Sequence, residues 1–395
     1  MAIDESGRIV AAGTLAELRR TISAPVTEFP GAVIMPGLVN AHTHLELTHF
    51  SAWKVRKGVD YMPRTYLDWV MQVIKIRRSL TESEIEQSIR EGLRISVESG
   101  VTALGDILVS RASLPVYSGV PLAGRIFFEA IGHDPLLGQQ SAMALEEAVD
   151  GCCNGSMLPG LSPHAPHTLS EALHRSIKAI ARTRALPTTI HLSESTYEGA
   201  FFFDSTGGIA DTLYPHVGWD DYLPAPRRTT PAAWLDGIGV LDEQTLAIHC
   251  VHLNPADVEI LHRRGVTIVL CPRSNARLNV GRAPVLLFKK AGIRLALGTD
   301  SLASNDSLSL WDEMRYLAHE FPDVFTADEI FRMATCDGAA ALGLADMTGK
   351  LEPGKRADFL IVDCGDLSAE VDIYSRIVGQ GRMMASYVNG AQVVH

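Results

Sequence analysis

The sequence predicts an α/β protein: a (β/α)8 TIM barrel with a small β-sandwich domain built from both chain ends. Two observations predict the barrel. Eight short runs rich in Val, Ile, Leu and Thr recur along the middle of the chain, and amphipathic stretches separate many of them. Strands that alternate with helices indicate a parallel sheet, and eight such units fit a closed barrel. The rival is an open dinucleotide-binding sheet, but no G-x-G-x-x-G follows an early strand.

The predicted strands are mostly bounded by Gly or Pro, which end regular structure. They cover residues 32–42, 100–107, 124–132, 157–164, 186–194, 245–253, 266–274 and 293–301. The helix predicted from residue 81 has a clear start, because Thr81 can cap it and Glu84 completes a capping box. The stretch between Glu194 and Leu246 is too long for a plain connection and is predicted to form a lid or a substrate wall.

The two chain ends differ from the middle in their sequence pattern. Residues 1–34 contain a hairpin-like piece, and residues 346–395 contain strand-like runs around an Asn-Gly turn. We expect both ends to form one small β domain beside a barrel that covers residues 35–345. The β pattern begins abruptly at Ile3, which predicts either a late start codon or an unusual sheet edge.

Composition narrows the class of protein and its partners. The chain is 46% hydrophobic and 21% charged, has a net charge of -11 and contains no Lys/Arg run, so nucleic acid and anionic membranes are poor partners. Its six cysteines show no C-x-x-C spacing and indicate free thiols in a reducing compartment. No signal peptide or bilayer-length apolar stretch is evident, so we expect a cytoplasmic enzyme with a small-molecule substrate. A homodimer is left open.

A histidine pair follows the first apolar run, in the stretch NAHTHLEL at residues 40–47. Alternate side chains of a strand share one face, so His42 and His44 should point the same way. They lie at the carboxyl end of the first predicted strand, where barrel active sites are built. The pair can be part of the core, a catalytic pair or half of a metal site.

Other strand ends favour the metal site. His191 ends the fifth predicted strand, His249 lies in the sixth and Asp300 ends the eighth. Neutral imidazoles with one carboxylate suit Zn²⁺, with Fe²⁺ as the alternative. The competing interpretation, scattered polar residues of a core, needs several coincidences at matching strand ends.

Six motifs carry a resemblance that covers nearly the whole chain: PGLVNAHTH, HLSE, HCVHL, CPRSNARLNVG, LGTDSLASN and EPGKRADFLIVD. With them the sequence resembles the amidohydrolase superfamily, in the branch of cytosine and adenosine-type deaminases and chlorohydrolases. The resemblance implies that the metal ligands are His42, His44, His191 and Asp300. It also implies catalytic roles for Glu194, His249 and Asp300.

The resemblance further implies one divalent metal and hydrolytic deamination. Dinuclear members use a carboxylated lysine on the fourth strand, and the corresponding region, GSMLPGLSPHAPHT, has no lysine. In the implied mechanism, Asp300 takes a proton from a metal-activated water, which His249 orients. Protonated Glu194 donates a hydrogen bond to a ring nitrogen beside the attacked carbon, and the amine leaves as ammonia.

Three motifs, NAHTHLELT, YPHVGW and CPRSNARLNVG, are most similar to aminodeoxyfutalosine deaminases of the alternative menaquinone route. The predicted substrate is therefore 6-amino-6-deoxyfutalosine. The alternatives are methylthioadenosine/S-adenosylhomocysteine deaminase, guanine deaminase and triazine chlorohydrolase. Outside the enzyme class, the alternative is a non-catalytic scaffold with the same fold.

Four residues are predicted to contact substrate. Glu46 follows His44 by two positions and is expected on the same face. The resemblance makes His164, at the end of the fourth strand, a substrate contact. Arg273 and Arg282 follow the seventh strand, where a guanidinium could bind an anionic part of the substrate.

Overall fold

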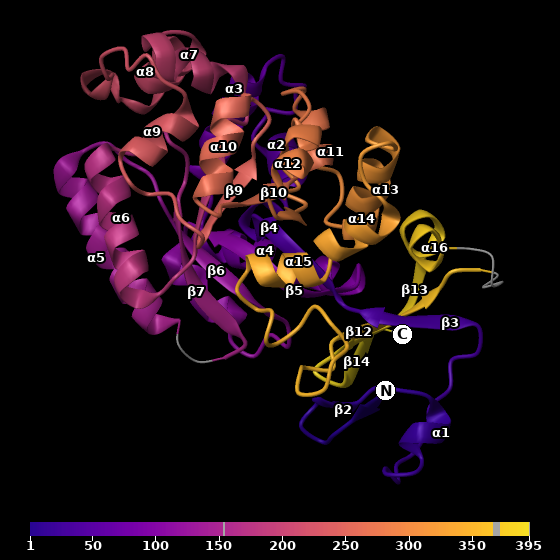
Figure 1. Ribbon diagram of the computed structural model, residues 1–395. Helices are drawn as coiled ribbons and strands as arrows, with labels where there is room; N and C mark the ends of the chain where they lie inside the picture. The colour runs from indigo at the N-terminus through magenta and orange to yellow at the C-terminus, as the bar shows by residue number, and fades with distance from the viewer. Residues whose placement is uncertain (153–154, 366–371, 395) are drawn as a thin grey trace.

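The computed structural model describes residues 1–152, 155–365 and 372–394. Its centre is a sheet of eight strands, each parallel to the next in chain order (Figure 1). The strands are β4 (Leu38–Thr43), β5 (Val101–Leu108), β6 (Ala123–Ala130), β7 (Met157–Pro163), β8 (Thr188–Leu192), β9 (Thr245–His249), β10 (Thr267–Leu270) and β11 (Leu295–Leu297). The predicted barrel is confirmed.

The first and last strands meet where the predicted metal ligands lie. The backbone N–H groups of Thr299 and Asp300 both donate to the carbonyl of His42, at 3.1 Å. A parallel bridge joins Thr43 to Asp300. The backbone at residue 298 can come this close to His42 only because the residue is glycine, since a Cβ there would lie 2.8 Å from the Cβ of His42. Closure of the barrel therefore places His42 beside Asp300.

Helices surround the barrel, and the main hydrophobic core lies between them and the outer face of the strands. These helices are α4 (Glu82–Glu98), α5 (Pro135–Gly151), α6 (Glu171–Arg184), α9 (Pro231–Gly237), α10 (Pro255–Arg263), α12 (Val285–Ala291), α13 (Leu310–Glu320) and α14 (Ala327–Met333). Thr81 caps α4 in a capping box with Glu84, as predicted. A smaller core fills the barrel interior and includes residues of α15 (Cys336–Ala341).

Further elements lie at the carboxyl ends of the strands. They are η1 (Leu45–Leu47), α2 (Phe50–Arg56), α3 (Tyr66–Arg77), η2 (Arg111–Tyr117), α7 (Thr196–Asp204), η3 (Ile209–Leu213), α8 (Tyr214–Val217), η4 (Asp220–Tyr222) and α11 (Pro272–Arg277). None of the helices in the described part of the chain is both long and apolar enough to cross a membrane.

Both chain ends contribute to a four-stranded antiparallel sheet beside the barrel (Figure 1). Its strands are β3 (Ala32–Pro36), β12 (Phe359–Asp363), β13 (Arg382–Val388) and β14 (Ala391–Val394), with α16 (Ile373–Gln380) alongside. A two-stranded ribbon of β1 (Ala2–Ile3) and β2 (Ile9–Ala11), followed by α1 (Leu15–Leu18), joins it at the N-terminus.

The run predicted as one strand over residues 32–42 is two strands. β3 pairs with β12 in the small sheet, whereas β4 pairs with β5 in the barrel. The break falls at Gly37, where a Cβ would lie 2.1 Å from the hydroxyl oxygen of Thr102. The limits predicted for the domains, at residues 34 and 345, stay a prediction.

Candidate metal and catalytic site

Three histidines from two strand ends converge in the barrel mouth. His42, His44 and His191 each offer a ring nitrogen, and these nitrogens lie within 4.8 Å of one another. The Nε2 atoms of His44 and His191 are 3.2 Å apart. His42 is fully buried, and its Nε2 has no hydrogen-bond partner among the described residues. Buried polar atoms without a partner are costly, so this atom is suited to be a metal ligand.

The protonation of His191 follows from its neighbour. Its Nδ1 lies 2.8 Å from the carbonyl oxygen of His164, and a carbonyl can only accept. Nδ1 therefore carries the proton, and Nε2 presents a lone pair toward His44. Burial lowers the pKa of His191 to about 4 and also holds the pKa of His44 well below its usual range. Neutral imidazoles of this kind are the form that binds a metal.

Asp300 completes the set. Its Oδ1 lies 3.7 Å from Nε2 of His42 and 3.6 Å from Nε2 of His44. Its Oδ2 accepts hydrogen bonds from the hydroxyls of Ser274 at 2.7 Å and Ser304 at 2.6 Å. Burial alone would raise its pKa, but the nearby His42, His44 and His249 hold that pKa well below its usual range. Three imidazoles with one fixed carboxylate fit a divalent metal such as zinc.

Glu194 and His249 lie beside this cluster. Nε2 of His249 is 3.7 Å from Oε1 of Glu194, while its Nδ1 lies 2.9 Å from Oδ1 of Asn275. The hydroxyl of Tyr66 donates to Oε2 of Glu194 at 2.7 Å. Burial, with a smaller contribution from the charge of Asp300, raises the pKa of Glu194 to about 8. Its carboxyl group is therefore mostly protonated at neutral pH.

The backbone at His249 is unusual. Leu246 and Ile248 point into the barrel, and Ala247 packs toward the helices. Simple alternation would turn His249 toward the helices as well. Its φ of 67° lies in the left-handed region, and its ring centroid lies 5.6 Å from that of His191. A strained backbone thus aims this side chain into the barrel mouth, as is common at functional sites.

A cavity of about 350 Å³ opens over these residues. Its polar wall includes His44, His191, Glu194, His249 and Asp300. The apolar wall includes Val70, Val73 and Ile74 of α3 and Ile209, Leu213, Val217 and Trp219 of the long segment after β8. That segment therefore does line the cavity, and the apolar area suits a flat ring.

His164 lies in the same cavity, as predicted, and its Nδ1 is 3.0 Å from the hydroxyl of Thr168. Sequence reasoning missed Glu129, whose carboxyl oxygen lies within 4.8 Å of ring nitrogens of His164 and His191. Glu129 is the penultimate residue of β6, within an apolar run, and carried no motif. Glu129 is thus a polar group of the cavity that the sequence did not indicate.

A comparison with protein families decides the relationship. The model of the amidohydrolase family matches residues 33–391. The chain belongs to the amidohydrolase family. The resemblance seen in the sequence is confirmed, and so is the predicted enzyme class, a hydrolase that acts on C–N bonds.

Two curated relatives of this amidohydrolase have named activities. The 5-methylthioadenosine/S-adenosylhomocysteine deaminase of Desulforudis audaxviator is 32% identical over 374 residues, which are 90% of this chain and 79% of the relative. The aminodeoxyfutalosine deaminase of Deinococcus radiodurans is 30% identical over 327 residues, 80% of this chain and 74% of the relative.

Solved structures confirm the fold. Helicobacter pylori aminofutalosine deaminase in complex with methylthio-coformycin superposes with a TM-score of 0.86 at 20% identity, covering 99% of this chain and 94% of that one. An adenosine deaminase from Xanthomonas campestris with bound zinc gives 0.82 at 23% identity, covering 98% and 87%. At this identity the likeness establishes the architecture alone.

The expected position of Glu46 needs correction. Strand β4 ends at Thr43 and η1 begins at Leu45, so the alternation that linked Glu46 to His44 does not continue. Glu46 is buried behind the cavity wall of this amidohydrolase. Its Oε1 accepts from the backbone N–H groups of Val109 at 3.0 Å and Ser110 at 2.7 Å. Glu46 does not itself line the cavity but contacts two residues that do, Val109 and its ion-pair partner Arg77.

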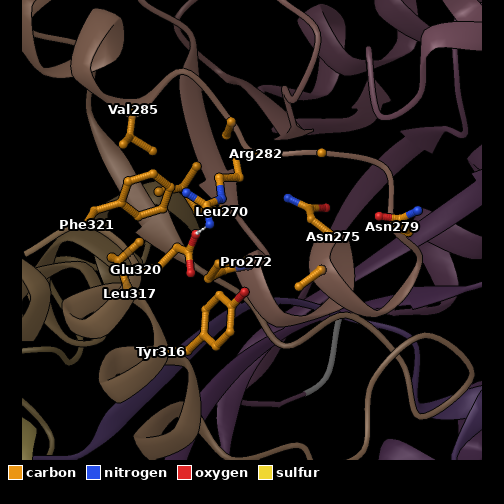
Figure 2. A pocket seen from close by; sticks show the side chains of 13 residues that line it. Leu270, Pro272, Asn275, Asn279, Arg282, Val285, Tyr316, Leu317, Glu320 and Phe321 are labelled. Carbon is orange, nitrogen blue, oxygen red and sulfur yellow. Dashed lines mark ion pairs between the residues drawn. The ribbon is translucent and has the colours of Figure 1, made fainter.

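The expected positions of Arg273 and Arg282 also need correction. Arg273 pairs with Asp306, donates to the hydroxyl of Ser307 at 2.8 Å and does not line the cavity above the histidines. Arg282 pairs with Glu320 at a separate pocket between the segment after β10 and α13 (Figure 2). Acidic side chains far along the sequence therefore engage both arginines.

Proposed function

We propose that this amidohydrolase is a metal-dependent deaminase that hydrolyses the amino group from the purine ring of a nucleoside. One observation carries the proposal: ring nitrogens of three buried histidines and the carboxylate of Asp300 converge beside Glu194 and His249. The deaminase names of its relatives support the reaction. A non-catalytic scaffold would have no need of a protonated glutamic acid beside a metal-binding cluster.

His42, His44, His191 and Asp300 would hold one divalent metal, with zinc favoured over iron. When bound, such a metal lowers the pKa of water toward neutrality. The zinc in the structure from Xanthomonas campestris supports this choice.

The chain's own residues then move the protons. Oε1 of Glu194, which has no hydrogen-bond partner in the described chain, donates to a ring nitrogen and withdraws electrons from the adjacent carbon. Ionised Asp300 accepts a proton from the attacking water, and His249 orients that water. Asp300 passes that proton to the amino group, which leaves as ammonia. The ring carbon keeps the water oxygen as a carbonyl, and the hydroxyl proton replaces the one that Glu194 donated.

For the substrate we propose 6-amino-6-deoxyfutalosine, which would place the enzyme in menaquinone biosynthesis. The relative from Deinococcus radiodurans supports this choice. The second candidate substrates are methylthioadenosine and S-adenosylhomocysteine, which the relative from Desulforudis audaxviator favours.

Ammonia release from each of these nucleosides and from adenosine tests the proposal, together with the metal content of the purified protein. We expect about one metal per chain, activity that chelation abolishes and zinc restores, and the highest kcat/KM for aminodeoxyfutalosine. Two tightly bound metals would contradict the mononuclear site. An absence of ammonia from every aminopurine tested would overturn the deaminase.

A further inference from the structure

Helix α3 lies along one side of the cavity. The segment from the first residue of α3 to its C-cap contributes eight cavity-lining residues, namely Tyr66, Leu67, Trp69, Val70, Val73, Ile74, Arg77 and Arg78. Most of them recur at intervals of three and four residues, which places them on one face of the helix. The wall that α3 presents to a substrate is therefore a continuous stripe.

The two ends of this stripe differ in chemistry. Tyr66 begins the helix and donates to Glu194, so it marks the end where the ring would react. Arg77 and Arg78 stand at the other end, eleven residues on, which is about 16 Å along a helix axis. The side chains of Val70, Val73 and Ile74 lie between. The stripe thus runs from a proton donor over an apolar stretch to two cations.

Arg77 is held in place without being enclosed. Its Nη2 contacts Oε2 of Glu46, whose other oxygen is fixed by two backbone N–H groups. The side chain of Arg77 keeps 27% of its surface exposed, and only one of its five N–H donors is directed at Glu46. Glu46 therefore orients the guanidinium and leaves donors for a ligand.

Arg78 is exposed at the cavity mouth. Its guanidinium forms no ion pair with any carboxylate in the described part of the chain. The ion-paired Glu46 offsets one of the two guanidinium charges. Glu129 also lines the cavity and interacts with the charge of Arg77, but burial raises the pKa of Glu129 to about 8, so an excess of positive charge remains while Glu129 is protonated. The planar guanidinium donates two parallel hydrogen bonds to a carboxylate, which makes it the side chain of choice for that group.

We infer that Arg77 and Arg78 form an anion subsite that binds a carboxylate at the end of the substrate remote from the reacting ring. The inference rests on the proposed function and specifies its substrate class, an aminopurine nucleoside whose sugar carries an anionic substituent. Glu46 is the positioning residue for Arg77. Binding energy from this remote contact holds the ring over the catalytic groups.

The test compares aminodeoxyfutalosine with its neutral methyl ester, a pair that differs in one charge. The variants are Arg77→Met and Arg78→Met, and Arg282→Met is the control because that arginine lies at a different pocket. We expect kcat/KM for the acid to fall roughly tenfold to hundredfold in each subsite variant, the range for a charged hydrogen bond. Turnover of the ester should change little, and Arg282→Met should resemble wild type on both substrates.

Removal of Arg77 leaves Glu46 buried without its ion-pair partner, which can destabilise the fold. The exposed Arg78 has no such partner, so Arg78→Met decides the question even if Arg77→Met does not fold. Equal losses on acid and ester, or equal kcat/KM for both in the wild type, would overturn the subsite while leaving the deaminase intact. Failure of the wild type to release ammonia from either compound would overturn the proposed function itself.

Discussion

Two groups of buried histidines differ in a way that identifies the site. His42, His44 and His191 lie at strand ends, whereas His133 and His174 lie in the surrounding shell of loops and helices. Burial lowers the pKa of His191 to about 4, and it lowers those of His133 and His174 to about 4 and about 3. A buried, neutral imidazole is therefore common to both groups.

Their surroundings separate them. The strand-end rings direct their Nε2 atoms toward one another and toward Asp300. The ring of His174 instead packs against Trp234, with centroids 5.4 Å apart, and His133 contacts the hydroxyl of Tyr214 at 3.0 Å. The comparison teaches that converging lone pairs beside a carboxylate mark a metal site, whereas burial and a lowered pKa alone do not.

The largest difference in metal content and activity is expected when one histidine of each group is substituted. His191→Ala should remove the metal and abolish ammonia release, because one of four proposed ligands is lost. His174→Leu should keep both metal and turnover, since its ring faces Trp234 rather than the cavity. Metal analysis and an ammonia assay on the two purified variants measure the difference. Retention of a full metal complement by His191→Ala would break the comparison.

The next largest effect is expected at Glu194 and His249, whose substitution should lower turnover without removing the metal. Glu194→Gln and His249→Asn should keep the metal yet lose on the order of 10²–10⁴-fold in kcat, the usual contribution of a positioned acid or base. His252→Asn serves as the control, because its Nε2 contacts the carbonyl of Val280 and lines no part of the cavity. Near-normal turnover in both variants would show that the assigned roles are wrong.

A smaller effect is expected from Tyr66→Phe. The hydroxyl lowers the pKa of Glu194, so its removal should raise that pKa further above 8. Only protonated Glu194 donates to the ring, and activity therefore falls as pH rises through this pKa. The alkaline limb of the kcat profile should move to higher pH, with kcat itself changing roughly tenfold or less for one lost hydrogen bond. An unmoved limb would mean that another group limits the rate.

The smallest effect concerns stability in acid. The unfolded chain protonates His174 near its ordinary pKa of 6.5, but burial lowers the folded pKa to about 3. The stability that this residue contributes is complete above pH 6.5 and is lost as pH falls toward 3. At pH 5.5 the loss is about 1.4 kcal/mol. Urea unfolding of His174→Leu should show a correspondingly weaker acid dependence than wild type, and an identical dependence would contradict the assignment.

The sequence could predict the strand-end residues because the barrel dictates where strand ends go. Once eight parallel strands are recognised, their carboxyl ends must share one face, and His42, His191 and Asp300 come together there. Tyr66 and Arg77 escaped prediction because they lie on α3, outside any strand. Their spacing along one helical face was a signal, but nothing local indicated that this face covers the cavity.

Local pattern alone determined the approximate places of the barrel strands, the capped start of α4 and the histidine pair, since each depends on residues a few positions apart. It did not show that residues 32–42 divide between two sheets. Only the tertiary structure decided which charged side chains are available. Arg273 pairs with Asp306, 33 residues away, and Glu46 pairs with Arg77, 31 residues away. It also decided the left-handed backbone that turns His249 inward. The physical reason is that ion pairing and backbone strain depend on neighbours that folding brings together, whereas periodicity is already present in the chain.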